Sequence, residues 1–150
     1  MKIAIAADHG GYALKEQIKI WLAEQGHEAV DFGCASPESV DYPDYAVTVA
    51  REVGEGRFPL GILVCGTGIG MSITANKVAG VRAALCNDTY CAEHARKHND
   101  ANIMAIGGRV VAPETALEIV KTFITSQFEG GRHQRRVDRI KQIENEWGNR

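Results

Sequence analysis

A cysteine that precedes a glycine-rich segment is the feature of this sequence best suited to chemistry. Cys65 opens the run CGTGIG at 65–70, which follows a short apolar stretch and leads into a helical pattern. Glycines let backbone N–H groups approach an anion closely, and the start of a helix carries partial positive charge. N–H donors of this kind favour the thiolate form of a cysteine. The run therefore predicts an anion-binding cradle with a reactive thiol at its edge.

The same segment has other interpretations. It lacks the lysine of a P-loop, and Met71 stands where a dinucleotide-binding G-x-G-x-x-G motif has its last glycine. Asp88, which follows Gly66 by 22 residues, is nevertheless placed like the acid that binds a ribose hydroxyl. A glycine-rich turn that serves packing alone, with Cys65 as a small buried apolar residue, also fits the pattern. The residues alone leave these alternatives open.

Histidines form a second group of candidates. Asp8 and His9 follow the first strand-like segment, where an aspartate also commonly caps the next helix. His94 and His98 are four residues apart on a helical segment, which is the spacing of metal ligands, and Cys91 is the one further ligand nearby. His98 is equally consistent with the polar wall of a site or with a surface histidine at a helix end.

Arginines offer a way to bind phosphate. Arg132 and Arg136 are separated by one helical turn, and Arg109 follows a pair of glycines. Guanidinium groups bind phosphate oxygens in a bidentate manner, so these residues suggest a clamp for a phosphate monoester. The alternative is a solvated helix face.

Five short apolar segments alternate with helical patterns, which predicts an α/β domain. The alternation favours a five-stranded parallel sheet between two layers of helices, a three-layer α/β/α arrangement with ligands beyond the carboxyl ends of the strands. The expected strands are 2–8, 28–33, 60–65, 81–86 and 102–108. The expected helices are 12–25, 45–53, 69–77, 88–98, 113–128 and 132–147. The helix at 113–128 carries an apolar stripe of Leu117, Val120, Ile124 and Phe128.

The last predicted helix carries an apolar stripe that the sheet does not require. At 100° per residue, Val137, Ile140, Ile143 and Trp147 share one arc, with Arg136 just inside its edge. Five strands are already covered by the preceding helices. We therefore expect this C-terminal helix to pack on a partner subunit, which predicts a homodimer.

Composition limits the classes of function. The 150 residues are 45% hydrophobic, which predicts a single domain over 1–150. The net charge of -2 argues against a nucleic-acid partner, because phosphates require a basic surface. The exception is a local basic run at 132–139. No apolar stretch is long enough for a membrane span or a secretory signal, so we expect a cytoplasmic protein without membrane partners. The four cysteines show no C-x-x-C spacing, which favours free thiols.

Several motifs together resemble those of the ribose-5-phosphate isomerase B family, which also includes the galactose-6-phosphate isomerase subunits. The resemblance covers the whole chain. It rests on IAIAADHGG at the start, ESVDYPDYA before the second helix, GILVCGTGIGMSITANK in the middle, ARKHNDANIMAIGGR, and GGRHQRRV near the end. One branch of the family replaces the cysteine by a glutamate at the position of Met71, so Cys65 is the base available here.

The resemblance implies an aldose–ketose isomerase of the pentose phosphate pathway with a Rossmann-like sheet. It would interconvert ribose 5-phosphate and ribulose 5-phosphate through an enediolate, with no cofactor and no metal. Cys65 would move the proton between C2 and C1, and His98 would open the furanose ring. In the family, the glycine loop binds the oxyanion and the sugar, which here assigns Gly66, Thr67, Gly68, Ile69 and Gly70, and the Thr67 hydroxyl also contributes to catalysis. Sugar contacts are implied for Asp8, His9 and Asn99. Binding chiefly of the phosphate is implied for Arg109, Arg132 and Arg136.

The resemblance also implies a homodimer, often a dimer of dimers, with part of each active site supplied by the neighbouring subunit. Two alternatives stay open. The first is an isomerase of a six-carbon sugar phosphate, allose or galactose 6-phosphate, and the second is a sugar-phosphate-binding module without catalysis.

Overall fold

A computed structural model describes residues 1–148 as a parallel sheet with helices on both faces. The strands are β1 (Lys2–Ala7), β2 (Glu28–Asp31), β3 (Leu60–Cys65), β4 (Ala83–Leu85) and β5 (Ile103–Gly107). The helices are α1 (Tyr12–Glu24), α2 (Tyr42–Gly54), α3 (Ile69–Ala75), α4 (Thr89–Lys97), α5 (Pro113–Thr125) and α6 (Arg132–Gly148). The strand order is β2-β1-β3-β5-β4 and every pairing is parallel, which confirms the predicted fold class.

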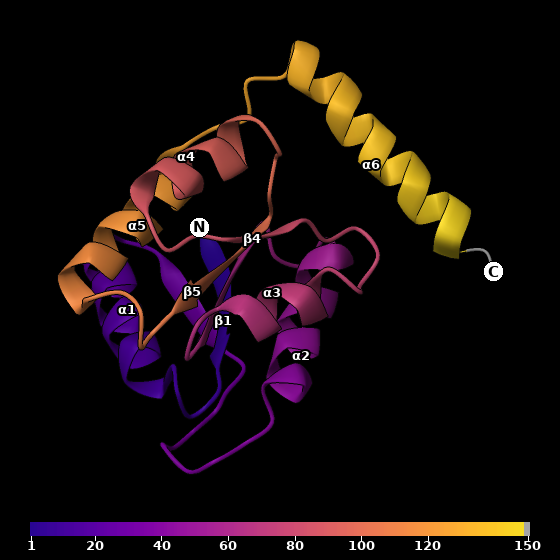
Figure 1. The fold of residues 1–150 in the computed structure, drawn as a ribbon. Coiled ribbons are helices and arrows are strands. Elements are labelled where there is room, and N and C mark those ends of the chain that lie inside the picture. Colours follow the sequence, from indigo (N-terminus) through magenta and orange to yellow (C-terminus); the bar gives the residue numbers. More distant parts are fainter. Residues whose placement is uncertain (149–150) are drawn as a thin grey trace.

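The helices form two layers around the sheet (Figure 1). Helices α1, α4 and α5 pack together on one face, and α2 and α3 pack together on the other. The chain leaves β1 towards β2 on one side and returns to β3 on the other side. The loops after β1 and β3 therefore diverge at a switch in strand order, which is where open α/β sheets bind their ligands.

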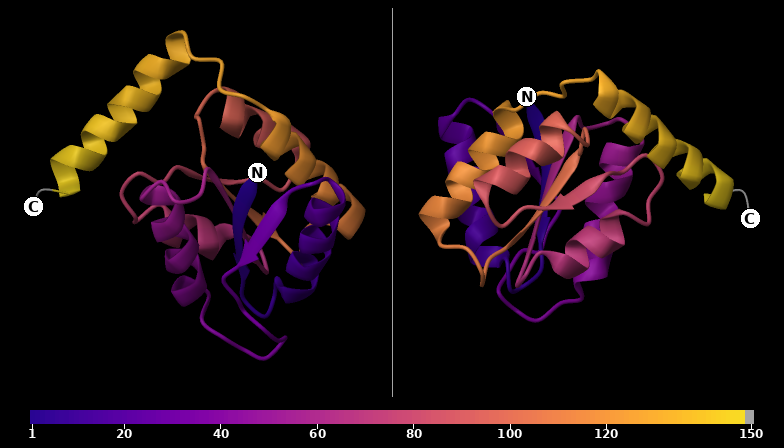
Figure 2. Two further views of the ribbon diagram at one scale, coloured as in Figure 1. Left: turned by 180° about the vertical axis from the view of Figure 1, so that it is seen from behind. Right: turned by 45° about the horizontal axis from the view of Figure 1, so that its top comes forward.

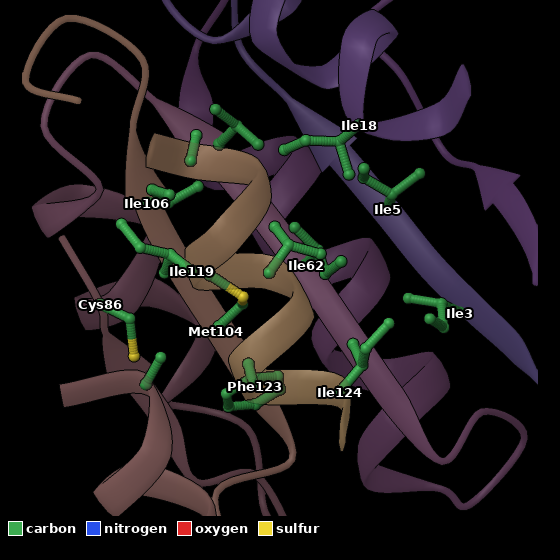
Figure 3. Packing of buried hydrophobic residues seen from close by; sticks show 14 of the residues in the cluster. Ile3, Ile5, Ile18, Ile62, Cys86, Met104, Ile106, Ile119, Phe123 and Ile124 are labelled. Atoms are coloured by element: carbon green, nitrogen blue, oxygen red, sulfur yellow. The ribbon is translucent and has the colours of Figure 1, made fainter. Parts of the chain in front are cut away.

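The core explains why the central strands read as continuous apolar runs. Strands β3 and β5 are buried along their whole length, because helices cover both of their faces. Figure 3 shows Ile62 and Met104 of the sheet against Ile119 and Phe123 of α5. This packing holds the ends of β3 and β5 rigidly, and the candidate residues follow directly from those ends.

Some predicted boundaries were wrong. Helix α2 begins at Tyr42 rather than at residue 45, because Pro43 suits the first turn of a helix. Helix α5 ends at Thr125, so Phe128 lies outside it and does not extend its buried stripe. Strand β4 is also shorter than the expected 81–86, spanning 83–85 at the edge of the sheet.

Helix α6 extends beyond the two helical layers (Figure 2), and its Glu144 carboxylate accepts the Gly80 N–H at 3.1 Å. Its first turns are anchored by His133 and Val137, which are the buried members of the helix within the described residues. Further along, Ile140, Ile143 and Trp147 are 45%, 42% and 62% exposed. The predicted apolar stripe thus exists, and beyond its first turns it does not pack into the core of its own chain. Within the described part of the chain, no helix combines the length and the apolar character needed to cross a bilayer.

Candidate active site

Three of the predicted segments meet at the carboxyl edge of the sheet. The hydrogen bonds between β3 and β5 continue beyond the strands, where the loop after β5 pairs with the glycine loop. The Gly108 N–H donates to the Cys65 carbonyl at 2.8 Å, and the Arg109 N–H donates to the Gly66 carbonyl at 3.0 Å. The Asp8 N–H donates to the Val64 carbonyl at 3.1 Å, which joins the loop after β1 to the same edge. The structure therefore brings the first, third and fifth strand ends together, as predicted.

The Cys65 sulfur lies inside the curve of the glycine loop. Its Sγ atom accepts the Gly68 N–H at 3.1 Å, and the residue is 4% exposed. Gly68 has a φ of +80°, and a Cβ atom there would approach the backbone of Ile106 to 3.0 Å. A glycine is needed for both reasons, and only this backbone turns the N–H towards the sulfur.

Asn87 fixes the glycine loop to the end of β5. Its Oδ1 accepts the Gly107 N–H at 2.9 Å, and its Nδ2 donates to the Thr67 carbonyl at 3.2 Å. The exposed Thr67 hydroxyl accepts the Ile69 N–H at 3.2 Å. Sequence reasoning gave Asn87 no role in the site, although an asparagine between β4 and the Asp88 cap was a signal for a loop contact.

Asp8 and His9 are oriented by backbone groups. The buried Asp8 carboxylate accepts the Gly11 N–H at 3.1 Å. Gly11 is itself the N-cap of α1, so Asp8 orders the turn before the helix and the expected capping by Asp8 was wrong. The Val40 N–H donates to His9 Nδ1 at 3.2 Å, which leaves the ring proton on Nε2 as a donor to a ligand. A Cβ atom on Gly10 would lie 3.1 Å from the Gly66 nitrogen and 3.3 Å from the Arg109 guanidinium carbon, so these groups surround the loop after β1.

His98 and Asn99 lie at the opposite edge of the sheet. His98 caps the C-terminus of α4, and the chain then passes Asn102, whose carbonyl accepts the Gly61 N–H at 2.9 Å. Gly61 stands near the amino end of β3, whereas Cys65 ends that strand. Four residues of strand span roughly 13 Å. Within one chain, therefore, the predicted acid/base and the predicted base do not share a site.

The His98 side chain sits in a cluster of aromatic rings. It stacks on His133 of α6 with ring centroids 4.0 Å apart and planes at 11°, and it meets His94 edge-on at 4.6 Å. Arg132 and Arg136 lie on the exposed side of the same turn of α6. Sequence reasoning did not single out His133, whose proximity to His98 depends on how α6 docks.

The predicted residues thus form two groups. The carboxyl edge holds Asp8, His9, the glycine loop and Arg109, and the amino edge holds His98, Asn99, Arg132 and Arg136. The expected clamp of three arginines is not assembled within one chain, because Arg109 lies at the other edge from Arg132 and Arg136.

The ligand spacing of His94 and His98 does not produce a metal cluster with Cys91. His94 Nδ1 lies 2.9 Å from the Tyr90 carbonyl. The ligand atoms that do cluster within 4.8 Å, among the described residues, belong to His98, Glu129 and His133.

Asp88 and Cys86, one of the two buried cysteines besides Cys65, have structural roles. Asp88 accepts the Cys91 N–H at 2.7 Å and caps α4. This hydrogen bond lowers the pKa of the Asp88 carboxyl. Burial raises the pKa of the Cys86 thiol to about 12, so it stays protonated at neutral pH.

Comparisons with known proteins find similarity along nearly the whole chain, in sequence and in fold. The ribose/galactose isomerase family model matches residues 3–140. Ribose-5-phosphate isomerase B of Escherichia coli is 50% identical over 143 residues, covering 95% of this chain and 96% of the relative. The solved structure of Clostridium thermocellum ribose-5-phosphate isomerase B has a TM-score of 0.96 and 52% identity, covering 98% of this chain and 99% of that one. A D-erythrulose-4-phosphate isomerase of Pectobacterium atrosepticum is 44% identical, covering 97% of each chain.

Proposed function

The chain belongs to the ribose/galactose isomerase family, and we propose that it interconverts D-ribose 5-phosphate and D-ribulose 5-phosphate through an enediolate. The observation that carries the proposal is the Cys65 sulfur, enclosed by a glycine loop at the switch point of the sheet and contacted by the Gly68 N–H at 3.1 Å. Relatives that share half of the sequence bear this activity in their names. We further propose that the reaction takes place in the cytoplasm as part of the pentose phosphate pathway.

The chemistry requires a base and a site for negative charge. A proton on a carbon beside a carbonyl is only weakly acidic, so its removal needs both a positioned base and stabilisation of the developing oxyanion. Cys65 supplies the base. Once deprotonated, its sulfur takes the proton from C2 of the open-chain aldose and returns it to C1 of the enediolate, while the hydroxyl proton moves from O2 to O1. Backbone N–H groups of 66–70 and the Thr67 hydroxyl bind the enediolate oxygens.

The acid/base that opens the furanose ring comes from a second subunit. His98 and Asn99 lie at the amino edge, across the sheet from Cys65, so one chain cannot apply both groups to one sugar. In a homodimer that sets the amino edge of one subunit against the carboxyl edge of its partner, each site would contain Cys65 from one chain and His98 from the other. The partition of the residues supports this arrangement.

The surface beside α6 supports association of two copies. Ile140, Ile143 and Trp147 face a groove of about 880 Å³ that also includes Val81 and Ala83. Exposed apolar side chains of this size on one helix favour burial against another protein surface. Arg132 and Arg136 lie earlier on the same helix, so docking of α6 would carry both guanidinium groups to the partner's site. There they would join Arg109 around the phosphate.

An isomerisation assay with ribose, allose and galactose phosphates, performed with a chelator, tests the proposal. The expected result is turnover of ribose 5-phosphate that the chelator does not reduce. Faster turnover of a six-carbon substrate would favour the first alternative, and the erythrulose-4-phosphate relative makes a four-carbon substrate worth including. Loss of turnover with chelator would contradict the metal-free mechanism.

A sugar-phosphate-binding module without catalysis is distinguished by Cys65→Ser. The proposal expects this variant to bind ribose 5-phosphate and to lose turnover, because the hydroxyl is a much weaker acid than the thiol. A wild-type protein that binds the sugar phosphate and turns over none of the substrates would show that the binding module is the correct alternative.

A further inference from the structure

We propose that His133 is a positioning residue for His98, holding the His98 ring by face-to-face stacking while it opens the sugar ring. This inference deepens the proposed function and rests on it. Neither the predicted site nor the family motifs gave His133 a role. The two histidines are far apart in sequence, and their ring centroids are 4.0 Å apart with planes at 11°.

The His133 ring has little freedom to move. The residue is 7% exposed, and its own N–H donates to the Gly130 carbonyl at 3.0 Å. The Glu129 N–H donates to the Lys97 carbonyl at 3.1 Å, which ties the segment before α6 to the end of α4, next to His98. One turn after His133, Val137 is 1% exposed. His133 is therefore a fixed surface on which the His98 ring rests, while His94 limits the ring on another side.

The surrounding charges favour a neutral His133. Burial lowers the pKa of His133, and the positive charges of His98, Arg132 and Arg136 lower it further, against the opposing effect of Glu129. The Glu129 carboxylate is 3.7 Å from His133 Nε2, and the α4 side contributes His94 and Lys97. Two stacked imidazolium ions would repel each other. A neutral His133 lets His98 carry the proton during ring opening.

The ring geometry distinguishes this role from metal binding. The ligand atoms of His98, Glu129 and His133 lie within 4.8 Å of one another. A metal ion requires imidazole lone pairs, which lie in the ring plane, to converge on one point about 2 Å from each nitrogen. In two nearly parallel stacked rings the lone pairs run side by side instead. The observed arrangement is that of ring packing.

The experiment compares the two directions of the reaction. Ribose 5-phosphate is a closed furanose that must be opened, whereas ribulose 5-phosphate is acyclic because its O5 carries the phosphate. Its open-chain aldose product closes spontaneously in water. We expect His133→Ala to lower kcat from ribose 5-phosphate by about tenfold or more, within the range of a positioned acid/base. The initial rate from ribulose 5-phosphate should change less than twofold. His133→Phe, which keeps a flat ring, should restore most of the loss.

Two control variants and one substitute comparison keep the test decisive. Gln134→Ala changes an exposed neighbour on α6 and should leave both directions unchanged. His98→Ala supplies the reference pattern for a lost ring-opening group. If His133→Ala does not fold, as judged by circular dichroism, the comparison of His133→Phe with His133→Asn replaces it, and Phe must then be the faster variant from ribose 5-phosphate.

Equal loss in both directions would overturn the proposal, because it would show a structural role alone. Unchanged rates in both directions for His133→Ala would also overturn it. Wild-type protein that is inactive on both sugar phosphates would instead refute the proposed function.

Discussion

The candidate residues at the two edges of the sheet are positioned in different ways. At the carboxyl edge, Cys65 and the glycine loop follow directly from a buried strand, and backbone hydrogen bonds fix their positions. At the amino edge, His98 and the arginines depend on contacts between side chains of α4 and α6, a helix that stands away from the core. The first edge is assembled within one chain. In the proposed dimer, the second edge contributes to a site only when another chain is brought to it.

The difference indicates how the tasks are divided. Proton transfer between carbons needs precise placement of base and oxyanion donors, and the backbone of the glycine loop provides it. Ring opening and phosphate binding use longer side chains that a partner can deliver. Variants at the two edges should therefore fail in different ways.

The largest expected effect is at the carboxyl edge. Cys65→Ala removes the base, and we expect kcat to fall by roughly 10² to 10⁴, the usual contribution of a positioned acid/base. Steady-state kinetics of ribose 5-phosphate isomerisation provide the measurement. Cys91→Ala, at an exposed cysteine, is the matched control and should retain full activity. Retention of activity by Cys65→Ala would refute its role.

The arginines of the amino edge should affect binding more than turnover. Arg136→Ala removes a charge-assisted contact to phosphate, worth roughly 1.5 to 3 kcal/mol, and should raise KM by about ten- to a hundredfold. Arg135→Ala changes the neighbouring guanidinium on the same helix and should leave KM near the wild-type value. An unchanged KM for Arg136→Ala would mean that this residue does not bind the phosphate.

A smaller effect, on stability, should appear at Gly68. Gly68→Ala places a Cβ atom against the backbone of Ile106 at a φ of +80°, and we expect a loss of roughly 1 to 3 kcal/mol in the free energy of unfolding together with reduced kcat. Gly56 has a φ of +77° with open space around it, so Gly56→Ala shows the cost of the backbone conformation alone. Urea denaturation compares the two. Equal destabilisation and unaltered kcat would show that the fit of the loop does not matter.

The sequence was most informative where local chemistry determines the structure. The apolar run before Cys65 predicted a central strand, and the glycines after it predicted the turn, because both depend on neighbouring residues. The start of α2 was misplaced although Pro43 marked its first turn. The end of α5 was placed too late, because an apolar Phe128 continued the expected stripe beyond Thr125.

The amino edge could not be predicted in the same way. His98 follows the helical pattern of α4, and nothing in its neighbours shows that it faces away from Cys65. The contact with His133 depends on the path from α5 to α6, and the loop contacts of Asn87 depend on β4 and β5 lying side by side. Such contacts arise from tertiary packing, which a local pattern does not encode.

The central claim is that one active site takes Cys65 from one chain and His98 with Arg132 from another. Mixing Cys65→Ala, which lacks the base, with Arg132→Ala tests it most directly when ribose 5-phosphate is kept well below the raised KM, so that each variant alone is nearly inactive. After subunit exchange, about half of the dimers contain both variants, and each has one intact site, so activity should return to about a quarter of the wild-type value. Verified mixed dimers without recovered activity would contradict the claim and place the whole site within one chain.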